Sequence, residues 1–318
     1  MQLRTIAPDA YARLVLPHTA ALWAGSRDLQ TYVSDTLAIA RSRFGRRHFR
    51  TNGLFEARTL LASFKGYDRT MCDGRSRLRA LGIGAVFTPE PFRGRGYATA
   101  MLGAALDRAR SDGYDLAYLF SDVGPQFYSA IGFRTLPSRQ MSLRADTLPS
   151  KRLTVAPLRD ADWNAVRRCY DLAARGHLRF ERTPLVWEWI RLRMRQRSES
   201  AGGQSYNLTV RHGRGIGAYV IGERIPERDT YVVEEFGFAG EIAALAIPPL
   251  LRAAAGDLGR ITGWLPPSGA RELLPKVSVR SRKTPILMAA PLSPVGMRVI
   301  KKLTERGAPD CCWPTDHL

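Results

Sequence analysis

A turn rich in glycine and arginine is the part of this sequence with the clearest chemistry. Residues 86–98 read Val-Phe-Thr-Pro-Glu-Pro-Phe-Arg-Gly-Arg-Gly-Tyr-Ala, an apolar run followed by a turn and the start of a helical pattern. Backbone N–H groups at the start of a helix lack helical partners and carry partial positive charge. Gly94 and Gly96 let the chain approach an anion closely, and two arginines add charged donors. The segment therefore predicts a binding site for a phosphate or pyrophosphate group.

Two common nucleotide-binding motifs do not fit this turn. A Walker loop requires Gly-Lys-Ser or Gly-Lys-Thr, and neither follows the glycines. A dinucleotide-binding turn requires a third glycine, where this chain has Thr99. A tight turn without a ligand remains the alternative.

A second motif follows about 30 residues later, where residues 119–133 read Leu-Phe-Ser-Asp-Val-Gly-Pro-Gln-Phe-Tyr-Ser-Ala-Ile-Gly-Phe. Arg93-x-x-Gly96-x-Ala98 resembles the Arg/Gln-x-x-Gly-x-Gly/Ala signature of the GNAT N-acetyltransferases. The ending Phe-Tyr-x-x-x-Gly-Phe resembles the strand-helix-strand of the same family. The resemblance covers residues 1–145. The residues of the two motifs are similar to those of fungal lysine acetyltransferases. More distantly, the tandem layout resembles the mycobacterial enhanced-intracellular-survival acetyltransferases.

The resemblance implies an N-acyltransferase that moves an acetyl group from acetyl-CoA, its co-substrate, to a primary amine by direct attack. In the family, the strand before the turn diverges from its neighbour and binds the pantetheine arm, while the turn binds the pyrophosphate. Tyr128 is the expected proton donor to the departing thiolate, and a packed aromatic is the alternative reading. The expected acetyl-CoA-binding residues are Val86, Phe87, Thr88, Arg93, Gly94, Arg95, Gly96, Tyr97, Ala98 and Ser121.

The general base is less clearly indicated, because the strand before the turn carries no carboxylate where many relatives have a glutamate. Glu56, Asp122, a water chain and the C-terminal carboxylate of Leu318 are the candidates, and Leu318 is the one taken as catalytic. Asp122 reads equally well as a cap of the short helix that follows it. An oxyanion donor is expected in the backbone near Phe87 or Thr88.

The elements that must position these residues alternate between strands and helices. Apolar spacing predicts helices at 11–23, 29–44, 97–110 and 126–131, and strands at 3–6, 54–57, 59–66, 78–88, 116–120 and 139–143. The last strand is expected to close the first domain.

The polar stretch at 146–152 suggests a domain boundary, which gives a GNAT domain at 1–148 and a second domain at 149–318. Leu153-Thr-Val-Ala-Pro echoes the start of the chain, and Gly215-Ile-Gly-Ala echoes Gly82-Ile-Gly-Ala. We therefore predict an α/β fold of two GNAT-like domains in tandem, each a mixed central sheet flanked by helices.

Residues 236–242 of the second copy lack the arginine-glycine signature and contain Glu241, so this copy is expected to be degenerate. Residues that could line an acceptor site from this copy are Trp187, Trp189, Glu234 and Glu235, with core packing favoured for the tryptophans.

Composition narrows the remaining function classes. The 318 residues carry 48 Lys and Arg against 29 Asp and Glu, a net charge of +19, but the basic residues are spread along the chain, which argues against nucleic acid as the partner. No apolar run is long enough for a membrane helix and no leader pattern is present, so a cytoplasmic protein is expected. The four cysteines show no metal-site spacing, and no metal is expected. The predicted partner is a small-molecule or peptide amine; the alternatives are a non-catalytic acyl-CoA-binding module and a nucleic-acid-associated protein with the same fold.

Overall fold

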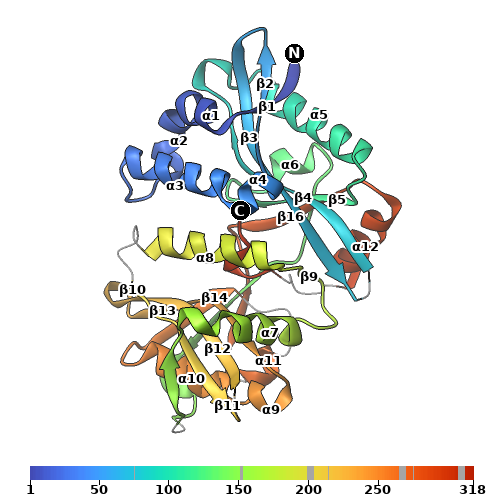
Figure 1. Ribbon diagram of the computed structural model, residues 1–318. Helices are drawn as coiled ribbons and strands as arrows, with labels where there is room; N and C mark the ends of the chain where they lie inside the picture. The colour runs from blue at the N-terminus through green and yellow to red at the C-terminus, as the bar shows by residue number, and fades with distance from the viewer. Residues whose placement is uncertain are drawn as a thin grey trace.

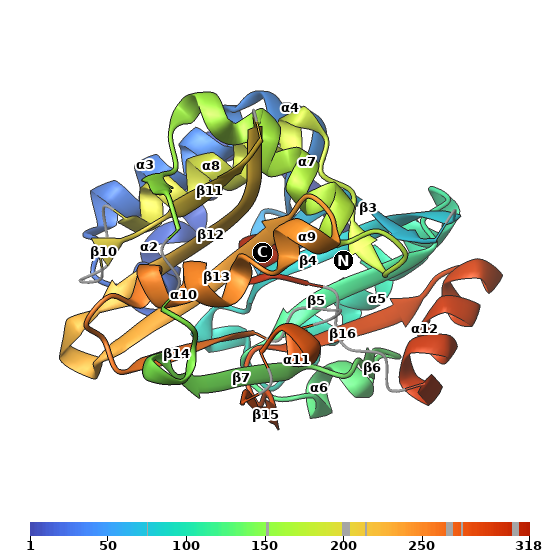
Figure 2. The same cartoon turned by 90° about the horizontal axis from the view of Figure 1, so that it is seen from below.

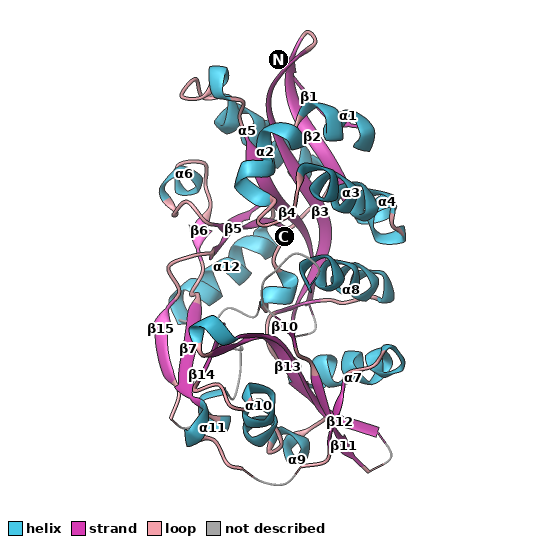
Figure 3. Ribbon diagram, turned by 90° about the vertical axis from the view of Figure 1, so that its left-hand side faces the viewer, coloured by secondary structure: helices cyan, strands magenta, loops and turns pink. Residues whose placement is uncertain are grey.

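The computed structural model describes residues 1–74, 76–150, 153–198, 204–213, 215–264, 270–274, 276–306 and 312–318. Two mixed sheets lie in opposite halves of the molecule, and the C-terminus lies between them (Figures 1 and 3). Within the described residues, every helix is too short or too polar to cross a bilayer.

The first sheet runs, in spatial order, through β1 (Gln2–Ile6), β2 (Phe49–Glu56), β3 (Thr59–Asp73), β4 (Ser76–Phe87), β5 (Leu116–Ser121), β16 (Ile286–Pro291) and β6 (Arg134–Thr135), with β9 (Arg179–Phe180) paired to β3. The second runs through β8 (Val155–Pro157), β11 (Leu208–His212), β12 (Gly215–Ile225), β13 (Thr230–Phe238), β14 (Arg260–Trp264), β7 (Arg139–Arg144) and β15 (Ser278–Ser281), with β10 (Gln204–Ser205) paired to β12. Among the described strands, β4–β5 and β13–β14 are the parallel neighbours, at the same place in each order.

In these main orders the two sheets exchange one strand each, and β9 pairs with β3 beside the main order of the first sheet. Strand β7 was expected to close the first sheet, but it pairs with β14 and β15 of the second. Strand β16 makes the reverse crossing and lies between β5 and β6, as Figure 2 shows. Each sheet therefore has the same strand order with a strand supplied by the other half of the chain. Residues on both sides of the boundary predicted after Leu148 contribute to each sheet.

This order confirms two copies of one fold and corrects one of the two sequence echoes. The opening echo is between equivalent strands, since β8 occupies in the second sheet the edge that β1 occupies in the first. The Gly-Ile-Gly-Ala echo is not, because Gly82 lies on β4 whereas Gly215 begins β12, the counterpart of β3. That echo is a coincidence between two strands that are not equivalent.

Helices cover both sheets. They are α1 (Pro8–Leu14), α2 (Leu16–Trp23), α3 (Leu29–Arg41), α4 (Arg43–His48), α5 (Tyr97–Ser111), α6 (Gln126–Ser129), α7 (Trp163–Ala173), α8 (Pro184–Ser198), α9 (Glu241–Ala244), α10 (Ile247–Ala255), α11 (Ala270–Leu273) and α12 (Pro294–Arg306).

Two helices predicted as continuous are each broken in two. The first break is at Val15, whose backbone leaves the helical region just before Pro17 in the first turn of α2. Proline lacks an N–H and is tolerated only in the first turn of a helix, so it starts a new one here. The second break is at Ser42, which is extended and whose hydroxyl accepts from the N–H of Gly45 at 2.9 Å. A serine in this role is a typical helix N-cap.

Candidate active site

A gap opens between the two parallel strands at the centre of the first sheet. Strands β4 and β5 pair from Ala80 to Ile83 against Leu116 to Leu119, and their pairing ends there although β4 continues to Phe87. β5 stays in the sheet because β16 pairs with it along its whole length. The end of β4 therefore has backbone N–H and C=O groups on its β5 side that the sheet does not use, which matches the divergence expected from the family resemblance.

A bulge in β4 lies at the start of this gap. The pairing with β3 shifts register between Ser63 and Lys65, and Ala85 on β4 has φ of 49°, a left-handed conformation in the middle of a strand. Such bulges redirect backbone groups away from the ladder. The irregularity is two residues before Phe87, where an oxyanion donor was expected, and Phe87 itself packs its ring in the core.

The glycine turn follows at the open end of the gap. Gly94 and Gly96 have φ of 74° and 75°, and a Cβ added to either would meet no atom within 4 Å. Ala100 is the first residue of α5 whose N–H bonds back, to Gly96, so the three preceding N–H groups have no helical partner. No side chain caps this end. Arg93 is exposed and its Nε donates to the Thr88 carbonyl at 3.2 Å. The loop thus presents free N–H groups, a helix dipole and open space, which fits a pyrophosphate.

The end of β5 carries Ser121 and Asp122. The Ser121 hydroxyl donates to the Gly124 carbonyl at 2.6 Å, so its proton holds the turn after the strand. Asp122 does not cap the helix that follows, because α6 has Pro125 at its N-cap position and no side-chain cap. Instead Asp122 lines a cavity, and burial raises the pKa of its carboxyl.

Tyr128 lies on α6, buried in the core of the first sheet. Its ring contacts Phe127 at 4.9 Å and Phe133 at 5.9 Å between centroids. The Phe133 N–H returns to the Tyr128 carbonyl at 3.1 Å across Gly132, which has φ of 94°, a closure typical of a helix end. Burial, and then the charge of Asp122, raise the pKa of the Tyr128 hydroxyl. Tyr128 therefore keeps its proton at neutral pH, as a donor must.

A cavity of about 280 Å³ lies where β3 and β4 meet α3 and α8. Its lining includes Lys65, Gly84, Asp122, Arg193 and Leu318. The backbone of Gly84 makes room for the last residue, since a Cβ there would lie 3.3 Å from Leu318 Cβ. The C-terminal segment thus enters this cavity beside the bulge.

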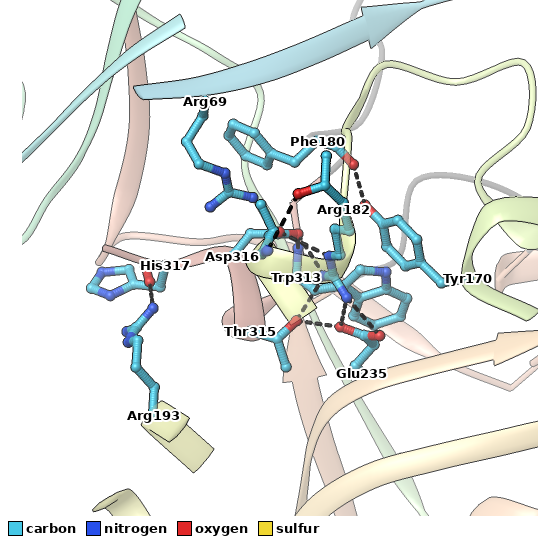
Figure 4. Close-up of polar contacts among 12 residues, drawn as sticks. Arg69, Tyr170, Phe180, Arg182, Arg193, Glu235, Trp313, Thr315, Asp316 and His317 are labelled. Carbon is cyan, nitrogen blue, oxygen red and sulfur yellow. Dashed lines mark hydrogen bonds and ion pairs between the residues drawn. The ribbon is translucent and has the colours of Figure 1, made fainter. Parts of the chain in front are cut away.

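A buried ion cluster holds that segment in place (Figure 4). Arg182 donates to both carboxylate oxygens of Asp316, at 3.1 and 2.8 Å, and to Glu235 at 2.9 Å. Arg69 adds a longer contact of 3.4 Å to Asp316. Thr315 donates to Glu235, which ties the segment to β13. The ionic side chains of the cluster are fully buried, so each charge depends on its partner.

The same segment packs where the second sheet would have its own gap. Strands β13 and β14 pair only from Thr230 to Val233 on β13, although β13 continues to Phe238. Trp313 packs edge-on against Phe236 of β13 at 5.0 Å. The turn after β13 leads into the four-residue helix α9 with Glu241 in its first turn, so it lacks both the long helix and the arginines of the first copy.

The remaining candidates from the sequence lie elsewhere. Glu56 is exposed at the β2–β3 hairpin turn and does not line the cavity. Trp187 and Trp189 are buried in the core, as favoured. Glu234 pairs with Arg197 at 2.7 Å, and Glu235 belongs to the ion cluster.

Lys65 and Arg193 are charged cavity residues that were not identified from the sequence. Lys65 is a single cation in the mostly apolar run of residues 60–67, and nothing nearby in the sequence indicates what covers it. Arg193 belongs to a run of arginines that alternate along residues 191–197, a pattern typical of an exposed helix end. It is instead partly buried, with its guanidinium over the ring of Trp189 and donating to the His317 carbonyl.

Comparison with known proteins agrees with this geometry. Residues 21–136 match the family profile described as an acetyltransferase (GNAT) domain. No curated protein sequence matches the chain. A GCN5-related N-acetyltransferase from Anabaena variabilis ATCC 29413 has a similar structure, with a TM-score of 0.73 and 14% identity over 93% of this chain and 74% of that one. Eis1 from Mycobacterium abscessus has a TM-score of 0.65 and 15% identity over 92% and 74% of the two chains.

A third similar structure is a tandem GNAT protein from the clavulanic acid biosynthesis pathway, with a TM-score of 0.52 and 12% identity over 92% of this chain and 99% of that one. At these identities the likeness concerns the fold. It confirms a mixed α/β fold of two GNAT-like units in tandem, a fold that supports acyl transfer from acyl-CoA.

Proposed function

We propose that this chain, which contains a GNAT acetyltransferase domain at residues 21–136, transfers the acetyl group of acetyl-CoA to the primary amine of a small molecule or peptide. The observation that carries the proposal is that three features adjoin the end of β4: a gap between β4 and β5, an uncapped glycine turn after the strand, and a cavity lined by Gly84 and Ala85. They offer one path for a long phosphorylated thioester and a separate entrance for an amine.

The first copy provides the groups that acetyl-CoA needs. Val86, Phe87 and Thr88 follow the last β4–β5 pair, and backbone groups in this stretch are suited to the amides of the pantetheine arm. The N–H groups from Gly94 to Ala98, with Arg93 and Arg95, are suited to the pyrophosphate. Tyr97 packs edge-on against Phe92 and supports the turn. Ser121 contributes by fixing the turn that closes the far side of the gap.

The chain's own groups then perform three tasks. The amine nitrogen forms a bond to the thioester carbon while the carbon–sulfur bond breaks, which yields an amide and coenzyme A. Backbone N–H groups at the bulge by Ala85 stabilise negative charge that develops on the carbonyl oxygen. Tyr128 gives its proton to the departing sulfur, and a base removes one from the nitrogen.

For the base we propose the α-carboxylate of Leu318, where the chain ends at this residue. Leu318 lies in the cavity beside Gly84, and the ion cluster fixes the residues just before it. Adding one glycine after Leu318 should lower turnover by about 10²- to 10⁴-fold while coenzyme A binding is retained. The Asp122→Asn variant is the matched comparison. If it loses activity and the extended chain does not, Asp122 is the base.

Turnover tests the proposal. The protein is incubated with acetyl-CoA and a panel of primary amines, thiol release is followed, and the acetylated amine is identified by mass. We expect amine-dependent thiol release with a matching amide product. A protein that binds coenzyme A tightly and acetylates none of the amines would instead be a non-catalytic acyl-CoA-binding module.

A further inference from the structure

The cavity beside Gly84 is lined by four cationic side chains, Arg27, Lys65, Arg193 and Arg197, and by the carboxylates of Asp35 and Asp122. Two of its cations are neutralised, because Arg27 pairs with Asp35 at 2.9 Å and Arg197 pairs with Glu234. Lys65 is not. Among the described residues its ammonium has no hydrogen bond or ion pair and lies only over aromatic rings, about 6 Å from their centroids.

Arg193 is the second cation without a carboxylate. Its guanidinium donates to the main-chain carbonyl of His317 and forms no ion pair within the described part of the chain. His317 adds no further positive charge, because burial and three neighbouring arginines lower the pKa of its imidazole to about 3. Burial, and then the charges of Arg193 and Arg27, lower the pKa of Lys65 to about 8, which leaves it largely protonated at neutral pH.

Lys65 lies on the same face of the sheet as the last residue of the chain. Lys65 on β3 is directly opposite Gly84 on β4, and residues directly opposite in a sheet project from the same face. Leu318 packs against that face at Gly84. Lys65 and the C-terminal residue thus share one side of the sheet, next to the bulge at Ala85. A partly buried ammonium that forms no ion pair is costly, and an anionic ligand would offset that cost.

We infer that the acceptor is a small amine that also bears a carboxylate, and that Lys65 and Arg193 bind this carboxylate while the amine points toward Asp122 and the bulge. The inference rests on the proposed function and adds the class of its acceptor. The cavity volume of about 280 Å³ suits an amino-acid-sized molecule. Polyamines and aminoglycosides carry further cations, which Lys65 and Arg193 would repel.

Three amines with the same chain length isolate the effect of the charge. 5-Aminopentanoate ends in a carboxylate, pentylamine in a methyl group and 1,5-diaminopentane in a second ammonium. We expect kcat/KM to be roughly 10- to 100-fold higher for the carboxylate than for pentylamine, the range for a charged hydrogen bond, and lowest for the diamine. Lys65→Met should abolish the preference and Lys65→Arg should preserve it. Lys301→Met removes an exposed lysine and is the control for net charge; it should behave as the unmodified protein.

Equal rates for the three amines, or a preference that survives Lys65→Met, would overturn the inference. Binding separates its failure from that of the proposed function. Affinity for 5-aminopentanoate and for pentylamine is measured by calorimetry on the protein saturated with coenzyme A. A preference for the carboxylate that depends on Lys65 supports the anionic subsite even if no acetylation occurs. Acetylation of all three amines without such a preference contradicts the subsite and leaves the acetyltransferase activity intact.

Discussion

The chemistry at the residue scale rests on groups held away from water. Tyr128 is nine-tenths buried, and Asp122 beside it has a carboxyl whose pKa is raised by burial. Both shifts favour the protonated form, which suits Tyr128 as an acid. The pKa of Lys65 is shifted in the opposite direction, so its ammonium loses its charge as the pH rises through about 8.

The Tyr128→Phe variant tests the acid. It keeps the ring and its contacts with Phe133 but removes the proton, so turnover should fall by about 10²- to 10⁴-fold while coenzyme A affinity changes little. Tyr231→Phe is the matched control. It removes a buried hydroxyl that donates to the Tyr206 carbonyl at 2.9 Å in the second sheet, and it should lower stability by about 1 kcal/mol without slowing turnover. A Tyr128→Phe enzyme with full activity would leave water or the substrate ammonium as the acid.

Residues were predictable from sequence where the signal is local. The turn at Gly94 and Gly96 was predicted because a strand, two glycines and a helix follow one another directly. Lys65 was missed because its burial depends on α3 and α8, far away in the chain, and a single lysine in a strand carries no local mark of what covers it. The ion cluster was missed for the same reason: Arg182 and Asp316 are 134 residues apart.

At the scale of elements, the start of α5 carries the anion site, and a substitution there can be matched closely. Gly96→Trp places a side chain in the open space before the free N–H groups, and it should weaken coenzyme A binding by roughly 10- to 100-fold. Gly25→Trp is the control, since Gly25 also has a positive φ (62°) and open space around its Cβ. The two variants share the backbone strain, so only the first should lose affinity in a calorimetric titration. Equal affinities would remove the turn from the cofactor site.

The C-terminal segment is the element whose position depends most on one side chain. Arg182→Met leaves Asp316 and Glu235 buried without their main partner, so unfolding stability should fall by about 3–5 kcal/mol. Turnover should fall further than stability alone explains, because Leu318 loses its fixed position. Arg144→Met breaks an exposed pair with Asp146 and should change neither quantity measurably. A stable, fully active Arg182→Met protein would contradict this role for the cluster.

At the scale of the whole molecule, the tandem arrangement was predictable and the strand exchange was not. The order of strands and helices repeats along the chain and indicates two copies. The pattern of residues 139–143 predicts a strand but not its partner. The alternation of apolar and polar residues indicates which face of the strand is buried, but it does not indicate which sheet the strand joins. The exchange also affects the site. One edge of β5 pairs with β16 along its whole length, which keeps β5 in the first sheet where its other edge separates from β4.

The two copies differ in what fills the equivalent region. In the first, the gap after Ile83 is followed by a long helix with free N–H groups. In the second, Trp313 and Thr315 of the C-terminal segment pack against β13, and Glu241 begins a four-residue helix. We therefore propose that the first copy binds acetyl-CoA, while the second positions the C-terminal segment in the first copy's site.

The stoichiometry of coenzyme A binding tests this central claim most directly. An isothermal titration of the full chain with coenzyme A should saturate at one equivalent, and the Gly96→Trp variant should lose that binding. Saturation at two equivalents, or one equivalent that survives Gly96→Trp unchanged, would contradict the account, because it would place a working cofactor site in the second copy.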